Sequence, residues 1–186
     1  MKRVECLEAV YDLLADCAVV TIMGAVAKEL YALGHRPNHL YLQHAMGTAS
    51  SVGLGIALAQ PRRQVVVLDG DGSVLMNLGT LTTLARYCPP NLTHVVFDNE
   101  SLLSVGGFPT ATSTGSDLAG MARAAGVPRV ETPQDPAAFA EVIRRVIRSV
   151  ELSCVVAKVE AVGPASYAMD LQLLENRFAF ARWLNS

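Results

Sequence analysis

The chain is poor in aromatic and charged side chains: 6% of its 186 residues are aromatic and 17% are charged. It has no basic block and no stripe of alternating basic and aromatic residues, so the composition gives no indication of nucleic-acid binding. The apolar runs "CAVVTIMG" and "VVVL" are strand-sized, far below the ~20 residues of a membrane span. The first residues, "MKRVECLEAVYDLL", place acidic residues inside an apolar pattern, which is atypical of a signal peptide. We therefore expect no nucleic acid and no membrane as partners.

Paired cysteines are also missing. The four cysteines, Cys6, Cys17, Cys88 and Cys154, show no CxxC spacing and lie in apolar stretches. Thiolate metal sites and redox motifs usually carry such paired spacings. We predict reduced thiols in the core of a cytoplasmic protein.

Aliphatic and small residues are what the chain has in abundance, and 51% of the residues are hydrophobic. Strand-like apolar runs alternate with segments of helical periodicity, which favours a doubly wound α/β fold: a mainly parallel, six-stranded sheet with helices on both faces. We expect one domain, residues 1–186, because two would be cramped at this length. The expected strands are 18–23, 40–43, 64–69, 93–99, 129–131 and 153–160; the expected helices are 4–14, 25–33, 47–60, 75–87, 117–126, 135–149 and 170–184, with a long loop over 100–116.

The segment "VVVLDGDGSVLMNLGTL" holds an acid between two glycines, where a strand gives way to a helix. One interpretation of Gly70-Asp71-Gly72 is a tight turn with a surface carboxylate. A dinucleotide-binding loop is a second, but Leu75 occupies the place of the third glycine in G-x-G-x-x-G. A bare carboxylate would also repel a pyrophosphate. A divalent cation removes this conflict, because Mg²⁺ commonly joins one or two protein oxygens to the phosphates of a ligand.

The next expected strand ends in "VVFDNESLLS", at the same edge of a parallel sheet. Asn99 offers a neutral carbonyl oxygen, and the turn that follows exposes a backbone carbonyl near Ser101. Ser73 and the N-terminus of its helix offer hydrogen-bond donors and a favourable dipole. The residues thus predict a metal held by Asp71, Asn99 and the Ser101 carbonyl, which in turn binds a diphosphate.

"GDGS", a helix, and a strand ending in "DN" together resemble the thiamine diphosphate (ThDP) motif, in which an Asn follows GDG by roughly 25 residues. Here Ser73 to Asp98 separate Gly72 from Asn99, and Asp98 replaces the first Asn of the frequent Asn-Asn pair. The stretch from His44 to Leu81 is similar to the diphosphate-binding (PP) domain along its whole length. The resemblance implies ThDP and Mg²⁺ as cofactors.

In that family an apolar residue at the place of Met46 props the cofactor into its bent form, and the carbonyl at the place of His44 accepts a hydrogen bond from the aminopyrimidine. Gly or Ser is commoner at that place. The imidazole of His44 is therefore a candidate for contact with substrate, and His44 is the single catalytic candidate. The alternative is that the imidazole has a packing or interface role. "MGAVAKEL" resembles the first PP-domain loop. The implied cofactor-binding residues are Gly24, Ala25, Val26, His44, Met46, Gly70, Gly72, Ser73, Asn99, Ser101 and Leu103.

"FDNESLLSVGGFPT" is similar to the corresponding segment of phosphonopyruvate and sulfopyruvate decarboxylases. ThDP enzymes also need a pyrimidine-binding (PYR) domain, which carries an activating glutamate, and the chain has no room for one. It therefore resembles the free-standing β subunit of sulfopyruvate decarboxylase. This implies a carboxy-lyase subunit, inactive alone, that acts on a small 2-oxo acid in an α₂β₂ or larger assembly with a PYR-domain α subunit.

Three alternatives stay open. An acetolactate-synthase-like carboligase subunit uses the same PP domain, although such enzymes usually carry a fused PYR domain. The β subunit of a 2-oxo acid oxidoreductase often carries iron–sulfur cysteines, for which the spacing is missing here. A non-catalytic ThDP-binding protein is the third.

Overall fold

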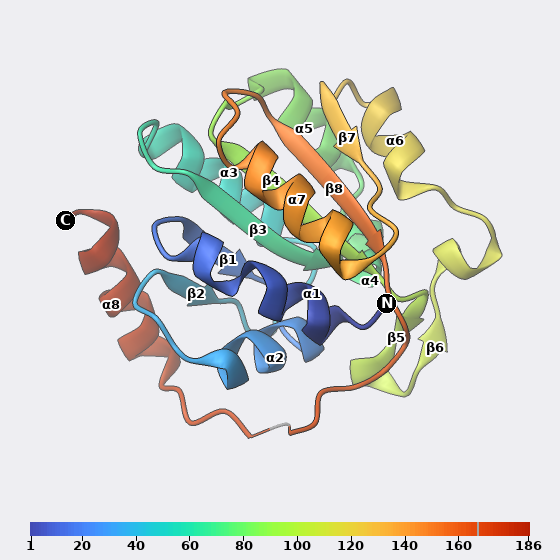
Figure 1. Ribbon diagram of the computed structural model, residues 1–186, viewed down its shortest axis with the longest axis horizontal. Helices are drawn as coiled ribbons and strands as arrows, with labels where there is room; N and C mark the ends of the chain where they lie inside the picture. Colours follow the sequence, from blue (N-terminus) through green and yellow to red (C-terminus); the bar gives the residue numbers. More distant parts are fainter. Residues whose placement is uncertain (167) are drawn as a thin grey trace.

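Six parallel strands form the centre of the computed structural model, which describes residues 1–166 and 168–186 (Figure 1). Their order in the sheet is β2-β1-β3-β4-β8-β7. The strands are β1 (Ala18–Thr21), β2 (His39–Tyr41), β3 (Val65–Gly70), β4 (Leu92–Asp98), β7 (Arg129–Glu131) and β8 (Ser153–Lys158). The predicted six-stranded parallel sheet is confirmed.

Helices cover both faces of this sheet (Figure 1). One face carries α1 (Arg3–Val10), α2 (Ala25–Leu33) and α7 (Pro136–Val146); the other carries α3 (Ala49–Ala59), α4 (Asp71–Met76), α5 (Gly79–Tyr87) and α6 (Leu118–Ala124). The last helix, α8 (Leu173–Leu184), packs against the edge strand β2. No helix within the described residues combines the length and the apolar character that crossing a membrane requires.

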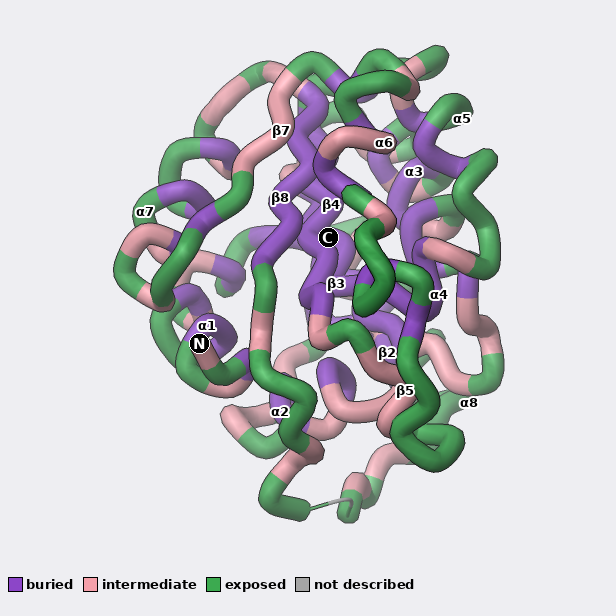
Figure 2. Tube along the Cα trace, turned by 90° about the vertical axis from the view of Figure 1, so that its right-hand side faces the viewer, coloured by how far each residue is buried: buried purple, intermediate pink, exposed green. Residues whose placement is uncertain are grey.

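The core lies along the central strands, which are buried over almost their whole length (Figure 2). Both faces of these strands are covered, so they read as largely apolar runs and not as alternating patterns, although β4 also carries the buried polar residues Thr93 and His94. Helix α3 approaches the sheet at Gly53, where any Cβ atom would collide with the side chain of Val67. The small-residue composition of this helix is therefore what allows the close contact.

Three predicted segments differ from the observed ones. The helix expected over 4–14 is α1 followed by a 3-10 turn, Tyr11–Leu14. The helix expected over 75–87 is two helices, because the chain leaves α4 at Asn77, whose side chain donates to the Gly47 carbonyl oxygen at 2.9 Å. The expected loop over 100–116 contains a small antiparallel hairpin, β5 (Ser101–Leu102) with β6 (Phe108–Pro109). Short 3-10 turns precede and follow β6, at Leu103–Val105 and Ala111–Thr114.

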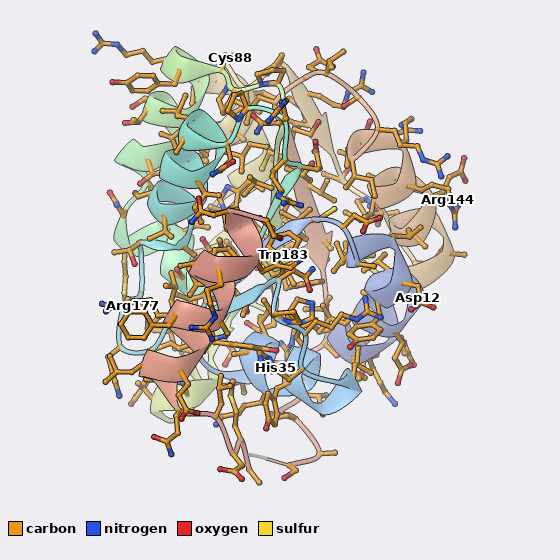
Figure 3. The ribbon with its side chains drawn as sticks, turned by 90° about the vertical axis from the view of Figure 1, so that its left-hand side faces the viewer. Asp12, His35, Cys88, Arg144, Arg177 and Trp183 are labelled. Atoms are coloured by element: carbon orange, nitrogen blue, oxygen red, sulfur yellow. The ribbon has the colours of Figure 1, made fainter. Side chains whose placement is uncertain are left out.

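The cysteine prediction is correct for three thiols and wrong for one. Cys6, Cys17 and Cys154 are free and buried, and burial raises the pKa of each thiol. Cys88 is free but exposed, at one end of the molecule (Figure 3). It is the C-cap of α5 with a left-handed φ of 43°, so its position is set by the end of the helix and not by the core.

The edge of the sheet at β2 is closed by a side chain. The Asn176 amide of α8 donates to the His39 carbonyl oxygen at 2.7 Å and accepts from the Tyr41 N–H at 3.1 Å. The side chain thereby occupies the two backbone groups that a neighbouring strand would take. An open edge strand is a template for pairing with other chains, and α8 covers this part of it.

His39 on β2 makes the stability of the fold depend on pH. Burial, with help from nearby Arg36 and His35, lowers the pKa of His39 to about 3, and within the described residues its Nε2 has no hydrogen-bond partner. Between the unfolded pKa of about 6.5 and the folded value, only the unfolded chain binds the proton, so stability is full above that window and falls as pH drops through it. We expect the free energy of unfolding to drop by about 2 kcal/mol from pH 7 to pH 5 through this residue.

Urea unfolding at the two pH values measures this drop in the wild type and in His39→Phe. The phenyl ring keeps the edge contacts with Tyr11 and Tyr41 and cannot titrate. The variant should lose about 2 kcal/mol less than the wild type over the same interval. Equal losses in both proteins would show that His39 is not the titrating group.

The topology places a crevice at the carboxyl ends of the central strands. The chain passes from β1 to β2 in one direction and then returns to form β3 on the other side of β1. In open α/β sheets, ligands bind at the carboxyl ends of the strands where the strand order reverses. The ends of β1 and β3, joined by the end of β4, are therefore where a ligand site is expected.

Candidate active site

A pocket opens at this switch point. It is formed by the segments that follow β1, β3 and β4, together with Met46 from the loop before α3. All predicted cofactor and metal residues except His44 line it: Gly24, Ala25, Val26, Met46, Gly70, Asp71, Gly72, Ser73, Asn99, Ser101 and Leu103. Residues more than 75 positions apart in sequence thus converge on one cavity, as the parallel topology requires.

Asp71 is the acidic side chain of this pocket and is 2% exposed. Its Oδ2 accepts hydrogen bonds from the hydroxyls of Thr110, at 2.5 Å, and Thr112, at 3.3 Å. Burial raises the pKa of Asp71 above its usual range; the Thr110 hydrogen bond opposes this shift and nearby Asp98 adds to it. A buried carboxylate with a raised pKa is short of positive charge, which a bound cation would supply.

Asn99 and Ser101 turn the chain at the end of β4. The Asn99 side-chain oxygen accepts from the Ser101 N–H at 3.1 Å, and Glu100 between them has a left-handed φ of 59°. Because the Thr110 N–H donates to the Glu100 carbonyl oxygen, Ser101 and Pro109 form a non-hydrogen-bonded pair of the hairpin. The carbonyl groups of such a pair point away from the partner strand, so the Ser101 carbonyl is available to another group.

The loop that carries Met46 is tied to α4. The Gly47 N–H donates to Ser73 Oγ at 3.0 Å, and the Gly47 carbonyl accepts from Asn77. Gly47 has a φ of 80°, and a Cβ there would lie 3.2 Å from the Asn77 Cβ. Ser73 is 3% exposed and, as an acceptor from Gly47, keeps its own hydrogen for donation. These contacts fix the residue after Met46 to Ser73 in α4 and to the C-cap residue Asn77.

Asp98 stands where the related motif usually has Asn, and donors surround it. Oδ1 accepts from Thr112 at 2.8 Å and from the Glu100 N–H at 3.2 Å, while Oδ2 lies 2.8 Å from Lys158 Nζ. Lys158 also pairs with Glu100 at 2.6 Å. The charge of a buried Asp98 is thus compensated by groups that a neutral Asn would not need.

A buried pair, Asp69 and His94, supports the start of the Gly70–Gly72 turn. Asp69 accepts from the Gly70 N–H through Oδ1, and its Oδ2 lies 3.2 Å from His94 Nε2. Both side chains are 1% exposed. His94 thus has a structural role beneath the pocket.

His44 lies outside the residues that line the pocket and is exposed. Its φ of 53° is in the left-handed region, which Gly adopts without steric cost and which His tolerates better than most residues. This backbone conformation suits the glycine that is common at the corresponding place in the family, and it also admits the histidine found here. The structure leaves the substrate role of His44 as a hypothesis.

The glutamates near the pocket are engaged elsewhere. Glu29 forms a bidentate ion pair with Arg3, at 2.8 and 2.9 Å, and both side chains are buried. Glu100 is exposed and paired with Lys158. Among the described residues that line the pocket there is no glutamate.

The sequence did not indicate several residues of this site. Arg3 and Leu102 line the pocket, and Leu102 packs over Gly72, where a Cβ would collide with it. Gly72 is therefore small to admit the hairpin, in addition to any room for a ligand. Thr110 and Thr112 reach Asp71 from a segment that reads as a polar loop, so no local pattern could have found them.

The donor set fits a hard cation that also binds phosphate. It offers one carboxylate, one amide oxygen and one backbone carbonyl, and in the described part of the chain no group of three His, Cys, Asp or Glu side chains is placed to hold a metal. Mg²⁺ takes few protein ligands and completes its shell with phosphate oxygens and water. At Gly24 and Gly70 the nearest described atom beyond the adjoining residues lies 3.9 Å from an added Cβ, so there is room for a ligand beside the backbone.

Fold and site together define a ThDP-binding domain of the doubly wound type. The chain belongs to the family described as "Thiamine pyrophosphate enzyme, C-terminal TPP binding domain", whose profile matches residues 23–157; thiamine pyrophosphate is the same cofactor as ThDP.

The curated relatives that the chain resembles include decarboxylases of two kinds. The chain is 48% identical over 125 residues to phosphonopyruvate decarboxylase of Streptomyces viridochromogenes, covering 67% of this chain and 31% of that protein. It is 47% identical to the sulfopyruvate decarboxylase subunit beta of Methanothermobacter thermautotrophicus over 57% of each protein. The corresponding subunit of Methanocaldococcus jannaschii is 36% identical over 70% of each. The chain thus spans about a third to somewhat over half of the first two relatives.

A solved structure supports the fold. The 2-oxoglutarate:ferredoxin oxidoreductase from Magnetococcus marinus matches with a TM-score of 0.67 and 19% identity, over 88% of this chain and 63% of that one. At this identity the likeness concerns the fold alone.

Proposed function

We propose that the chain is the ThDP- and Mg²⁺-binding subunit of a 2-oxo acid decarboxylase of the sulfopyruvate or phosphonopyruvate type. One observation carries the proposal: Asp71, Asn99 and Ser101 line one pocket whose wall includes Met46. The identity of 47–48% to two decarboxylases, over 125 and 106 residues, supports the reaction class.

In this proposal the residues of the chain mainly hold and orient. Asp71, Asn99 and the Ser101 carbonyl bind Mg²⁺; Ser73 and the backbone at Gly24–Val26 and Gly70–Gly72 hold the diphosphate. Met46 holds the bent form of the cofactor, and Leu103 covers its side. When bound, ThDP supplies the electron sink that takes the electrons released with CO₂. The His44 carbonyl fixes the aminopyrimidine, and its imidazole, with Ser104, contacts the acidic second group of the substrate.

A separate PYR-domain chain supplies the activating glutamate in a cytoplasmic α₂β₂ assembly or a multiple of it. The pairing of Glu29 with Arg3 and of Glu100 with Lys158 supports this division, because each carboxylate is already paired with a cation and neither residue lines the pocket. The beta-subunit relatives also support a two-chain enzyme.

The test is a decarboxylation assay with ThDP and Mg²⁺, using the chain alone and then mixed with the product of a neighbouring PYR-type gene. Sulfopyruvate, phosphonopyruvate and pyruvate are the substrates. We expect activity in the mixture only, with a substrate that carries a second acidic group, and a lower rate in His44→Gly. Activity of the chain alone would refute the two-chain division. Release of CO₂ with formation of a carboligation product in place of the free aldehyde would favour the acetolactate-synthase-like alternative. ThDP binding without turnover would favour the non-catalytic one.

A further inference from the structure

Two threonines from outside the predicted motif contact its central carboxylate. Thr110 follows β6 and Thr112 lies in the 3-10 turn Ala111–Thr114; their exposed fractions are 7% and 4%. The Thr110 hydroxyl is 2.5 Å from Asp71 Oδ2 and 2.8 Å from the Thr112 hydroxyl. The contact joins residues 39 positions apart in sequence.

Both contacts to Asp71 fall on the same oxygen, Oδ2. The two threonine hydroxyls engage Oδ2, and neither of them contacts Oδ1. Oδ1 is therefore the candidate oxygen for a cation, beside the backbone N–H groups of Gly72 and Asn99 that also hydrogen-bond the Asp71 carboxylate. Groups that hydrogen-bond a ligating side chain fix its orientation, and their loss typically costs 10- to 100-fold in metal affinity. The Thr110 and Thr112 hydroxyls hydrogen-bond Asp71, the proposed metal ligand, in this way.

Thr112 is shared between the ends of two strands. Its hydroxyl reaches Asp98 Oδ1 at 2.8 Å as well as Asp71 and Thr110. A hydroxyl has one hydrogen to donate, so Thr112 cannot serve both carboxylates fully, whereas the hydrogen of Thr110 is directed to Asp71. The two threonines therefore differ: Thr110 is the main donor to Asp71, and Thr112 bridges Asp71 to Asp98.

We propose that Thr110 and Thr112 are positioning residues of the metal site, which hold the Asp71 carboxylate in the orientation that presents Oδ1 to the metal. The inference rests on the proposed function, since it assumes that Asp71 binds Mg²⁺. It also assigns a role to the segment after β6, because these hydroxyls join the hairpin over Gly72 to the metal ligand.

Paired substitutions separate this role from packing. The Thr110 methyl group lies 3.6 Å from the place of a Cβ at Gly72, so the side chain both packs and donates. Thr110→Val keeps the methyl and removes the donor; Thr110→Ser removes the methyl and keeps the donor. Thr114→Val is the matched control, because the Thr114 hydroxyl is exposed and bonds only the local Ala111 carbonyl among the described residues.

The measurement is a titration of the full chain with Mn²⁺ at saturating ThDP, alone and mixed with the PYR-type chain, followed by the electron paramagnetic resonance of free Mn²⁺. Mn²⁺ accepts the same oxygen ligands as Mg²⁺. We expect Thr110→Val to weaken binding by about 10- to 100-fold, Thr112→Val by less, and Thr110→Ser and Thr114→Val to bind like the wild type. Circular dichroism of each variant confirms that it is folded.

The outcomes are distinguishable. If Thr110→Val binds Mn²⁺ with the affinity of the wild type, the positioning role is overturned and the proposed function still stands. The same holds if Thr110→Ser binds Mn²⁺ weakly while Thr110→Val does not. Absence of ThDP-dependent Mn²⁺ binding by the wild type, alone and in the mixture, would overturn the metal site and the inference with it.

Discussion

In the proposed two-chain enzyme, Asp71→Asn is expected to reduce decarboxylation by about 10²-fold or more, the equivalent of about 3 kcal/mol, because the proposed metal site would lose its charged protein ligand. The change keeps the shape of the side chain and an oxygen that can accept from Thr110. The variant should need higher concentrations of Mg²⁺ and ThDP to reach half of its maximal rate, and the rate at saturation should also fall. Steady-state rates measured over a range of both cofactors give the two effects separately.

Asp117→Asn is the matched control for this variant. Asp117 is exposed and precedes α6, and within the described residues no side-chain hydrogen bond from it caps the helix. Full activity in Asp117→Asn together with full activity in Asp71→Asn would remove Asp71 from the metal site. A loss of activity in both would point to a general effect of the lowered negative charge.

Glu29→Ala is expected to destabilise the chain by about 3–5 kcal/mol, because it leaves the buried Arg3 guanidinium without its carboxylate. Arg3 would keep its hydrogen bond to the Val162 carbonyl oxygen, at 3.0 Å. The pair joins α1 to α2, and α2 begins directly after the pocket residue Gly24. Urea unfolding measures the change in the free energy of unfolding.

Removal of both charges should cost less than removal of one. An Arg3→Met and Glu29→Leu double variant leaves no buried ion at this position, and apolar replacements of whole pairs are often close to neutral. Glu8→Ala, an exposed position on α1, should change stability by no more than about 0.5 kcal/mol. A double variant as unstable as Glu29→Ala would mean that packing, and not the unpaired charge, dominates.

The sequence predicted the site through the ends of its strands. Gly70–Ser73 and Asn99 each follow an apolar run, and parallel strands bring such ends to one edge. The strand and helix patterns were sufficient for the six strands and for α2, whose observed bounds, Ala25–Leu33, are those expected. A single sequence shows the periodicity of its helices and strands and the spacing of its motif residues, so these features could be predicted.

What the sequence could not predict depends on pairs distant along the chain. Thr110 contacts Asp71 only because a hairpin, expected as plain loop, folds back over Gly72. Lys158 pairs with Asp98 only because β8 lies beside β4, with the two residues in register. Neither partner carries a local signal, so charge compensation at Asp98 and orientation of Asp71 become visible in three dimensions alone.

Asn176 has a consequence for how this domain can assemble. Its amide takes the backbone groups of His39 and Tyr41 that a further strand would need. Another chain cannot prolong the sheet beyond β2 in this region unless α8 first moves away. Assembly through a continuous intermolecular sheet is therefore directed to the opposite border, at β7, and any partner that covers the cofactor pocket has to dock by side-chain contacts and not by strand addition at β2.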